Sequence, residues 1–164
     1  MSLYASVKLD AVADVAAVAE RVVARFTRNT ARFLPTVEVH HIGATSMPFG
    51  HTKGDVDVNI RVEERTFEYA VSLLREHYEV AQFANWTPTY ASFSSDRYEL
   101  PLGIQVTVSG SADDFLLDLR DRMRSEPELL RRYDEIKLGA ATRGPDAYWE
   151  AKNDFLKNIL AARR

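Results

Sequence analysis

Residues 39–62 read VHHIGATSMPFGHTKGDVDVNIRV, and in this segment two strand signals enclose a small polar loop. The second signal, from Gly54 to Val62, alternates strictly between polar and apolar side chains. Alternate side chains of a strand share a face, so Asp55 and Asp57 lie about 6–7 Å apart at their backbones. Carboxylates this close repel each other unless a cation lies between them, and Mg²⁺ usually takes one or two protein carboxylates plus phosphate oxygens. The segment therefore predicts a site for phosphate chemistry, with Asp55 and Asp57 as metal ligands and catalytic groups.

The loop between the two strands has features of a phosphate-binding turn. Gly43 lets the backbone approach a ligand closely, and backbone N–H groups at the start of a helical turn cradle phosphate. Thr45 and Ser46 add hydroxyl donors, and Lys53 adds a positive charge. His51 lies in the same loop. Each feature alone also fits an ordinary turn, so the hypothesis depends on their combination with the two carboxylates.

The composition is that of one globular domain covering residues 1–164. A net charge of −3 creates no overall attraction for nucleic acid or an anionic membrane, although arginine pairs at 131–132 and 163–164 allow a local basic patch. The absence of cysteine excludes disulfides, thiolate metal sites and a cysteine nucleophile. No apolar run reaches the length of a signal peptide core or a membrane span, so we expect a cytoplasmic protein.

Hydrophobic periodicity predicts an α+β fold, in which helices flank a mixed sheet of four or five strands and the C-terminal third is helical. Asp10 is expected to cap the first helix, and Ser94 to Asp96 is expected to form a hairpin turn. The expected strands are Thr36–Ile42, Gly54–Val62, Tyr78–Phe83, Tyr90–Phe93 and Tyr98–Val108. The expected helices are Asp10–Arg28, Glu63–Tyr78, Asp113–Ser125, one from Pro127 and one from Pro145.

The order Ile-Gly-Ala, ten residues, then Asp-Val-Asp resembles the signature of the nucleotidyltransferase (polymerase β-like) superfamily. Within it, residues 41–48 (HIGATSMP) resemble the His-[Val/Ile]-Gly-Ser-Thr-[Ala/Ser]-Val-Pro motif of the GrpB family. Residues 53–57, 115–137 and 148–156 resemble further motifs of that family, in the expected order. The resemblance implies a nucleotidyltransferase-like fold that binds a nucleoside triphosphate and Mg²⁺, with the phosphates at Gly43, Thr45, Ser46 and Lys53.

The chain departs from these patterns at several positions. Ala44 replaces the usual serine and removes one hydroxyl from the loop. Gln105 lies where active members of the superfamily have a third acid, and where GrpB relatives commonly have a histidine. Glutamine can orient a ligand but adds no negative charge and is no strong base. Asp55 is an extra acid where GrpB relatives often have an apolar residue, and Glu99 is the only other acid nearby.

Two functions follow from the sequence. The first is transfer of a nucleotidyl group to a hydroxyl or amine acceptor; the second is a catalytically silent, ligand-binding accessory domain, which the missing third acid favours. GrpB-like domains also occur fused to a coenzyme A biosynthetic kinase, which fits an accessory role. Nucleic-acid binding is disfavoured by the net acidity. Trp86, Tyr90 and Phe93 fit either a base-stacking surface or the core, and the sequence leaves the oligomeric state open.

Overall fold

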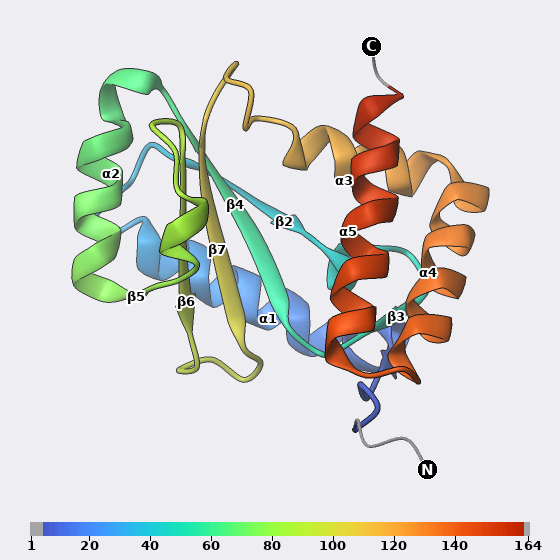
Figure 1. Cartoon of the computed structure of the whole chain (residues 1–164). Coiled ribbons are helices and arrows are strands. Elements are labelled where there is room, and N and C mark those ends of the chain that lie inside the picture. The colour runs from blue at the N-terminus through green and yellow to red at the C-terminus, as the bar shows by residue number, and fades with distance from the viewer. Residues whose placement is uncertain (1–4, 163–164) are drawn as a thin grey trace.

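The computed structural model describes residues 5–162 and contains a five-stranded mixed sheet (Figure 1). The strand order is β2-β4-β7-β6-β5, in which β4 and β7 pair in parallel and the other neighbours are antiparallel. The strands are β1 (Asp10–Ala11), β2 (Glu38–Ile42), β3 (His51–Thr52), β4 (Val56–Val62), β5 (Glu79–Val80), β6 (Tyr90–Ser95) and β7 (Leu102–Val108). The helices are α1 (Val12–Thr30), α2 (Glu64–His77), α3 (Leu116–Ser125), α4 (Pro127–Ala141) and α5 (Pro145–Ala161), with short 3₁₀ turns at Ala44–Ser46 and Phe83–Asn85. The mixed sheet and the helical C-terminal third are as the sequence predicts.

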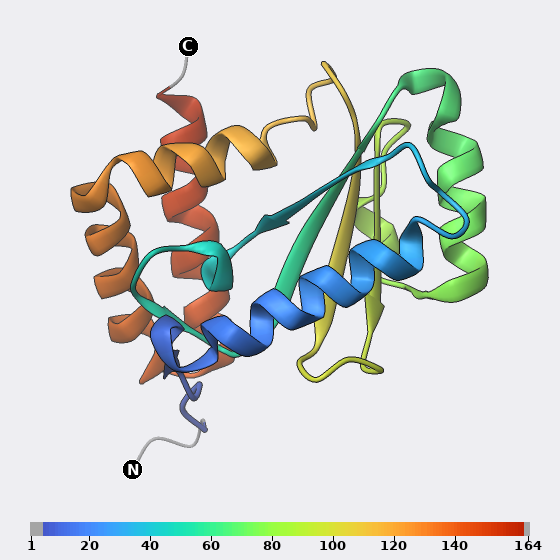
Figure 2. The same cartoon turned by 180° about the vertical axis from the view of Figure 1, so that it is seen from behind.

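The alternation of β4 divides the sheet into an apolar face and a polar face. Val56, Val58 and Ile60 are fully buried and pack in one core with apolar residues of α1 and α2. Figure 2 shows α1 crossing this face of the sheet. The intervening residues Asp57 and Asn59 point to the opposite face, as period-two geometry requires. The polar face is therefore free of α1 and α2.

The C-terminal helices form a second apolar cluster beside the sheet. Met123, Leu130, Tyr133 and Ile159 are its buried members, and the rings of Tyr133 and Phe155 stack at 5.1 Å. Both α4 and α5 begin with proline, which the first turn of a helix tolerates because its N–H groups have no partner there. Figure 1 shows α3, α4 and α5 grouped on the side of the sheet where β2 ends.

Three local predictions were wrong. Asp10 does not cap α1; it pairs with Thr52 in the small β1–β3 ladder, and the helix begins after Ala11. The turn expected at Ser94 lies later in the chain, because Ser94 and Ser95 still pair with β7. The strand expected from Tyr98 begins only after Pro101, which has no N–H to donate to a sheet.

Glu99 consequently lies outside β7, and its carboxylate pairs with Arg21 of α1 at 2.9 Å. The arginine pair at 163–164 is outside the described residues. Within residues 5–162, no helix combines the length and apolar character that a membrane span requires.

Candidate nucleotide and metal site

A cavity of about 410 Å³ lies between the polar face of the sheet and the C-terminal helices. Its size is within the usual range for small-molecule sites. The sheet side contributes Asp55, Asp57 and Gln105, and α5 contributes Trp149 and Lys152. Leucine, methionine and phenylalanine side chains form much of the remaining lining. A few charged groups in a mostly apolar wall are typical of a ligand site.

Asp57 is held between two glycines, one on each neighbouring segment. In the sheet register it lies opposite Ile42 of β2 and Gly103 of β7. A Cβ atom on Gly103 would lie 2.5 Å from Asp57 Oδ1, and one on Gly43 would lie 2.7 Å from Asp57 Oδ2. Gly43 also has a φ of +74°, which L side chains rarely adopt. Both positions therefore require glycine if the Asp57 carboxylate is to stay where it is.

The Asp57 carboxylate has an unusual electrostatic environment. Burial and, to a smaller extent, the neighbouring Asp55 carboxylate raise its pKa to about 6, although the charges of Lys152 and Lys53 oppose the shift. No hydrogen-bond donor reaches this carboxylate within the described part of the chain. A negative charge in this position is stabilised by a bound cation.

Asp55 and Asp57 are the only acidic pair at this edge of β4. Across residues 5–162, no group of three histidine, cysteine, aspartate or glutamate side chains has the arrangement of a metal site. A cation at Asp57 would thus take at most two protein carboxylates. This fits Mg²⁺, which completes its shell with water and ligand phosphate oxygens.

Two lysines bring positive charge to the acidic pair. Lys53 Nζ lies 3.9 Å from Asp55 Oδ2 and 4.4 Å from the centroid of the Trp149 ring. Lys152 Nζ lies 4.9 Å from the same ring, and burial lowers its pKa. The two ammonium groups are therefore held by one indole, at the distance of a cation–π contact. Both can neutralise an anionic ligand that enters the cavity.

A histidine–aspartate pair forms another part of the cavity wall. Asp134 of α4 accepts hydrogen bonds from the backbone N–H of His51 at 2.7 Å and from its Nδ1 at 2.8 Å. A carboxylate accepts only, so Nδ1 carries the proton and Nε2 is left with its lone pair in the neutral ring. Lys137, which is 3% exposed, donates to the His51 carbonyl oxygen at 2.6 Å, and burial lowers its pKa to about 8. His51 thus makes three hydrogen bonds, two to Asp134 and one from Lys137.

In the predicted phosphate loop, the hydroxyl groups of Thr45 and Ser46 already have hydrogen-bond partners within the protein. Ser46 Oγ donates to the Gly43 carbonyl at 2.7 Å, and Thr45 Oγ1 lies 2.9 Å from His41 Nε2. Both hydroxyls are buried, and neither residue lines the cavity. Arg124 of α3 donates to the Ser46 carbonyl at 2.8 Å and so fastens the loop to the C-terminal helices.

The predicted site residues therefore divide into two groups. Gly43, Asp55, Asp57 and Gln105 line the cavity, whereas Thr45, Ser46 and Lys53 lie next to it. Gln105 Oε1 accepts a hydrogen bond from the Tyr90 hydroxyl at 3.2 Å. Of the three aromatic residues left open by the sequence, Tyr90 and Phe93 line the cavity, and Trp86 packs against Phe93 at 5.3 Å.

Sequence reasoning missed Asp134, Lys137 and Trp149, all of which line the cavity. One signal was present in the chain. Lys137 occupies an apolar position of the periodic pattern in α4, four residues after the buried Tyr133. A lysine in a buried stripe needs a compensating partner, and here that partner is the carbonyl group of His51.

Comparison with known proteins agrees with this architecture. The family model described as GrpB protein matches residues 12–162. A UPF0157 protein of Vibrio cholerae is 29% identical over 142 residues, which cover 86% of this chain and 75% of that protein. The crystal structure of the conserved protein GrpB from Enterococcus faecalis superposes with a TM-score of 0.67 at 17% identity, covering 93% of this chain and 99% of that one.

The fold also resembles that of a nucleotide-binding polymerase. The Cid1 poly(U) polymerase, in a crystal structure described as MgGTP bound, superposes with a TM-score of 0.52 at 13% identity. The match covers 76% of this chain and 41% of that one. At this identity the likeness concerns the fold alone. The chain belongs to the GrpB family and has a nucleotidyltransferase-like fold.

Proposed function

We propose that the cavity binds a nucleoside triphosphate together with Mg²⁺ and supports transfer of its nucleotidyl group to a hydroxyl or amine acceptor. The observation that carries the proposal is the Asp57 carboxylate. It lies in a cavity between two glycines, lacks a hydrogen-bond donor among the described residues, and faces a helical wall with Lys152. A cation at Asp55 and Asp57 would offset the two carboxylates, and Lys53 and Lys152 would offset part of the phosphate charge.

The remaining residues would bind and orient the substrates. When bound, Mg²⁺ would neutralise charge on the phosphate oxygens and orient them. Lys53 and Lys152, which contact the Trp149 ring, would bind the β- and γ-phosphates. The apolar wall of the cavity would exclude water. The acceptor oxygen or nitrogen would attack the α-phosphorus, and the bond to the β-phosphate would break with release of pyrophosphate.

The acceptor must lose a proton during this reaction, and Gln105 is unable to take it. His51 is suited to that role because Asp134 holds its Nδ1–H and leaves Nε2 available. Such general-base assistance typically contributes about 10²–10⁴ in rate. In this proposal, His51 replaces the third carboxylate that the sequence lacks.

The test is a calorimetric titration with ATP, GTP, CTP and UTP, each with and without Mg²⁺. We expect magnesium-dependent binding of at least one nucleotide. The nucleotide affinity should fall at least about tenfold in Asp57→Asn, because the substitution removes a charged group that would bind the metal. Asp154→Asn is the matched control: it removes the same charge from an exposed position of α5 outside the cavity lining. Equal affinities of the two variants would overturn the proposal.

A second function, a catalytically silent ligand-binding domain, is favoured by one observation. The site has a carboxylate pair in place of a cluster of three metal-binding side chains among residues 5–162. In that case the wild type and His51→Gln would both bind nucleotide, and neither would turn it over. A loss of turnover in His51→Gln with unchanged nucleotide affinity would instead support the transferase.

A further inference from the structure

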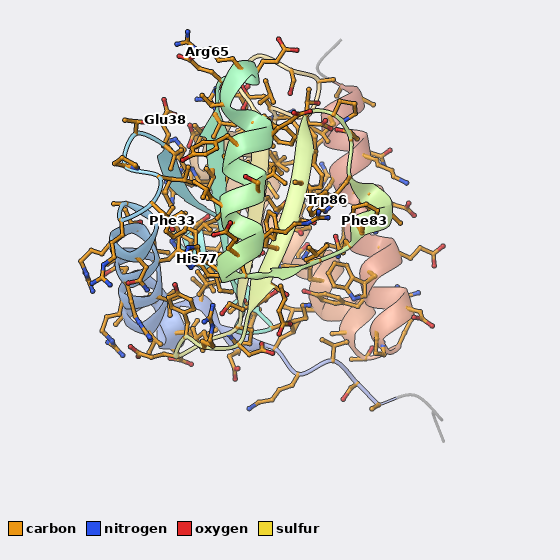
Figure 3. All side chains as sticks on the ribbon, turned by 90° about the vertical axis from the view of Figure 1, so that its left-hand side faces the viewer. Phe33, Glu38, Arg65, His77, Phe83 and Trp86 are labelled. Carbon is orange, nitrogen blue, oxygen red and sulfur yellow. The ribbon has the colours of Figure 1, made fainter. Side chains whose placement is uncertain are left out.

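A second pocket, with a volume of about 500 Å³, lies where α1 and α2 end and where β6 connects to β7. Three arginines line it: Arg25 of α1, Arg32 of the turn that follows α1, and Arg97 of the connection. Figure 3 views this end of the molecule, with Phe33 and His77 adjacent at the ends of the two helices. Their rings stack at 4.2 Å and form one wall. None of the lining residues belongs to the cavity described above.

Arg25 and Arg97 are held in place by contacts that do not neutralise their charge. The Arg25 guanidinium lies 4.9 Å from the Tyr98 ring centroid, and its Nη1 donates to the Arg97 carbonyl at 3.4 Å. Arg97 donates to the carbonyl of His77 and lies 5.9 Å from the Tyr78 ring. The Arg32 side chain has no hydrogen-bond or ion-pair partner within residues 5–162. Carbonyl and ring contacts fix a guanidinium but leave its full charge for a ligand.

Among residues 5–162, no carboxylate lines this pocket. Glu99 is not a lining residue of the pocket. The pKa of its carboxylate is lowered mainly by the hydrogen bond from Arg21 and, to a smaller extent, by the charge of Arg25. Tyr78, Tyr98 and Asn29 contribute uncharged polar groups. The Tyr78 and Tyr98 hydroxyls lie 3.1 Å apart, and Asn29 Nδ2 donates to the Tyr98 hydroxyl at 3.3 Å. The pocket is therefore positively charged, although the chain has a net charge of −3.

We propose that this pocket binds the phosphoryl group of a small phosphorylated ligand. Guanidinium groups match phosphate oxygens geometrically and make paired, charge-assisted hydrogen bonds to them. Exposed arginines that meet at one pocket from separate segments suit a compact anion. A nucleic-acid strand would need a groove with successive stacking surfaces, and the only ring faces stacked here belong to Phe33 and His77, which cover each other. The site is independent of the proposed nucleotide cavity.

The test is a calorimetric titration of the whole protein with pyrophosphate at constant ionic strength. Arg32→Gln removes one charge from the pocket without breaking a described contact, and we expect it to weaken binding about tenfold, the usual effect of one charge-assisted hydrogen bond. Arg28→Gln is the matched control, because it removes the same charge from an exposed position four residues earlier, in α1 and outside the pocket. Its affinity should equal that of the wild type.

Lys152→Met distinguishes pyrophosphate binding at this pocket from binding in the cavity at Asp57, which Lys152 lines. The proposal predicts that pyrophosphate still binds Lys152→Met with an affinity sensitive to Arg32→Gln. It is overturned if the wild type does not bind pyrophosphate, if Arg28→Gln and Arg32→Gln weaken binding equally, or if only Lys152→Met weakens it. Tighter binding of a single-stranded oligonucleotide, with Arg28→Gln as harmful as Arg32→Gln, would also overturn it, because the ligand would then be a strand lying across the surface.

Discussion

Gly103 and Asp57 form a closely packed pair across the parallel strands β4 and β7, in which a Cβ atom on the glycine would lie 2.5 Å from the carboxylate. Gly103→Ala should therefore displace the Asp57 carboxylate. We expect a loss of about 1–3 kcal/mol of unfolding free energy from overpacking, and weaker magnesium-dependent nucleotide binding. Denaturant titration and calorimetry measure the two effects.

Gly139→Ala is the control for this change. Gly139 is an exposed helical residue of α4, and an added Cβ would meet no neighbouring atom. Alanine should stabilise it by roughly 0.5–1 kcal/mol, because alanine has the higher helix propensity. If Gly103→Ala bound nucleotide as well as Gly139→Ala, the glycine would have no role in positioning Asp57.

The pH dependence of stability should report on His41. Burial, followed by the charges of Arg124 and Arg120, lowers its pKa from 6.5 to about 4. Between these values the unfolded chain binds a proton that the folded protein does not, so stability from this group is complete above pH 6.5 and is lost as the pH falls toward 4. Because the ring is partly exposed, we expect its contribution to be on the order of 1–2 kcal/mol.

Thermal unfolding between pH 4 and 8 checks this prediction. His41→Gln should flatten the decline in melting temperature below pH 6.5, whereas His77→Gln, which removes a histidine from an exposed position, should leave the decline unchanged. An unaltered pH profile in His41→Gln would show that His41 is not the responsible group.

The Asp134 carboxylate should stabilise the fold through His51. Asp134→Ala removes the acceptor of two His51 hydrogen bonds and leaves a partly buried backbone N–H without its partner. We expect a loss of about 1–3 kcal/mol, measured by denaturant unfolding. Nitrogen NMR of the histidine ring should also show the Nδ1–H form in the wild type and a mixture of tautomers in the variant. An unchanged spectrum would contradict the pairing.

Lys152→Met tests the contribution of positive charge at the helical wall. Methionine fills a similar volume, and removing a cation from a partly buried position should leave stability equal or slightly higher. We expect the affinity for a nucleoside triphosphate to fall by about tenfold. Lys157→Met removes an exposed lysine of the same helix and should have no effect. Identical affinities in the two variants would exclude Lys152 from ligand binding.

The sequence predicted the sheet well because period-two alternation is a local property. From Val56 to Val62, each side chain's face follows directly from its neighbours. The same reasoning placed Asp55 and Asp57 on the cavity side, and the resemblance to the superfamily placed Gln105 there. It failed at Asp10, because a distant residue, Thr52, pairs with it and overrides its preference for capping a helix.

The other half of the cavity could not be predicted in this way. That Gly103 lies opposite Asp57 depends on strand register, and that Lys152 and Asp134 reach the sheet depends on how α4 and α5 dock. Both are long-range relationships set by packing of the second apolar cluster. The inward orientation of Thr45 and Ser46 likewise results from His41 and from the bonds of Arg124, which is 78 positions away from Ser46.

The proposed transferase function requires a divalent cation that binds at Asp57 together with a nucleotide. The most direct test of this requirement is NMR of the wild-type protein titrated with Mn²⁺ and ATP, since paramagnetic Mn²⁺ broadens nearby amide signals and substitutes for Mg²⁺ at oxygen ligands. We predict that the amide signals of Gly43 and Gly103 disappear first, that the signal of Gly139 persists, and that Asp57→Asn abolishes the selective loss. Broadening that spares Gly43 and Gly103, or that is the same in Asp57→Asn, would contradict the claim.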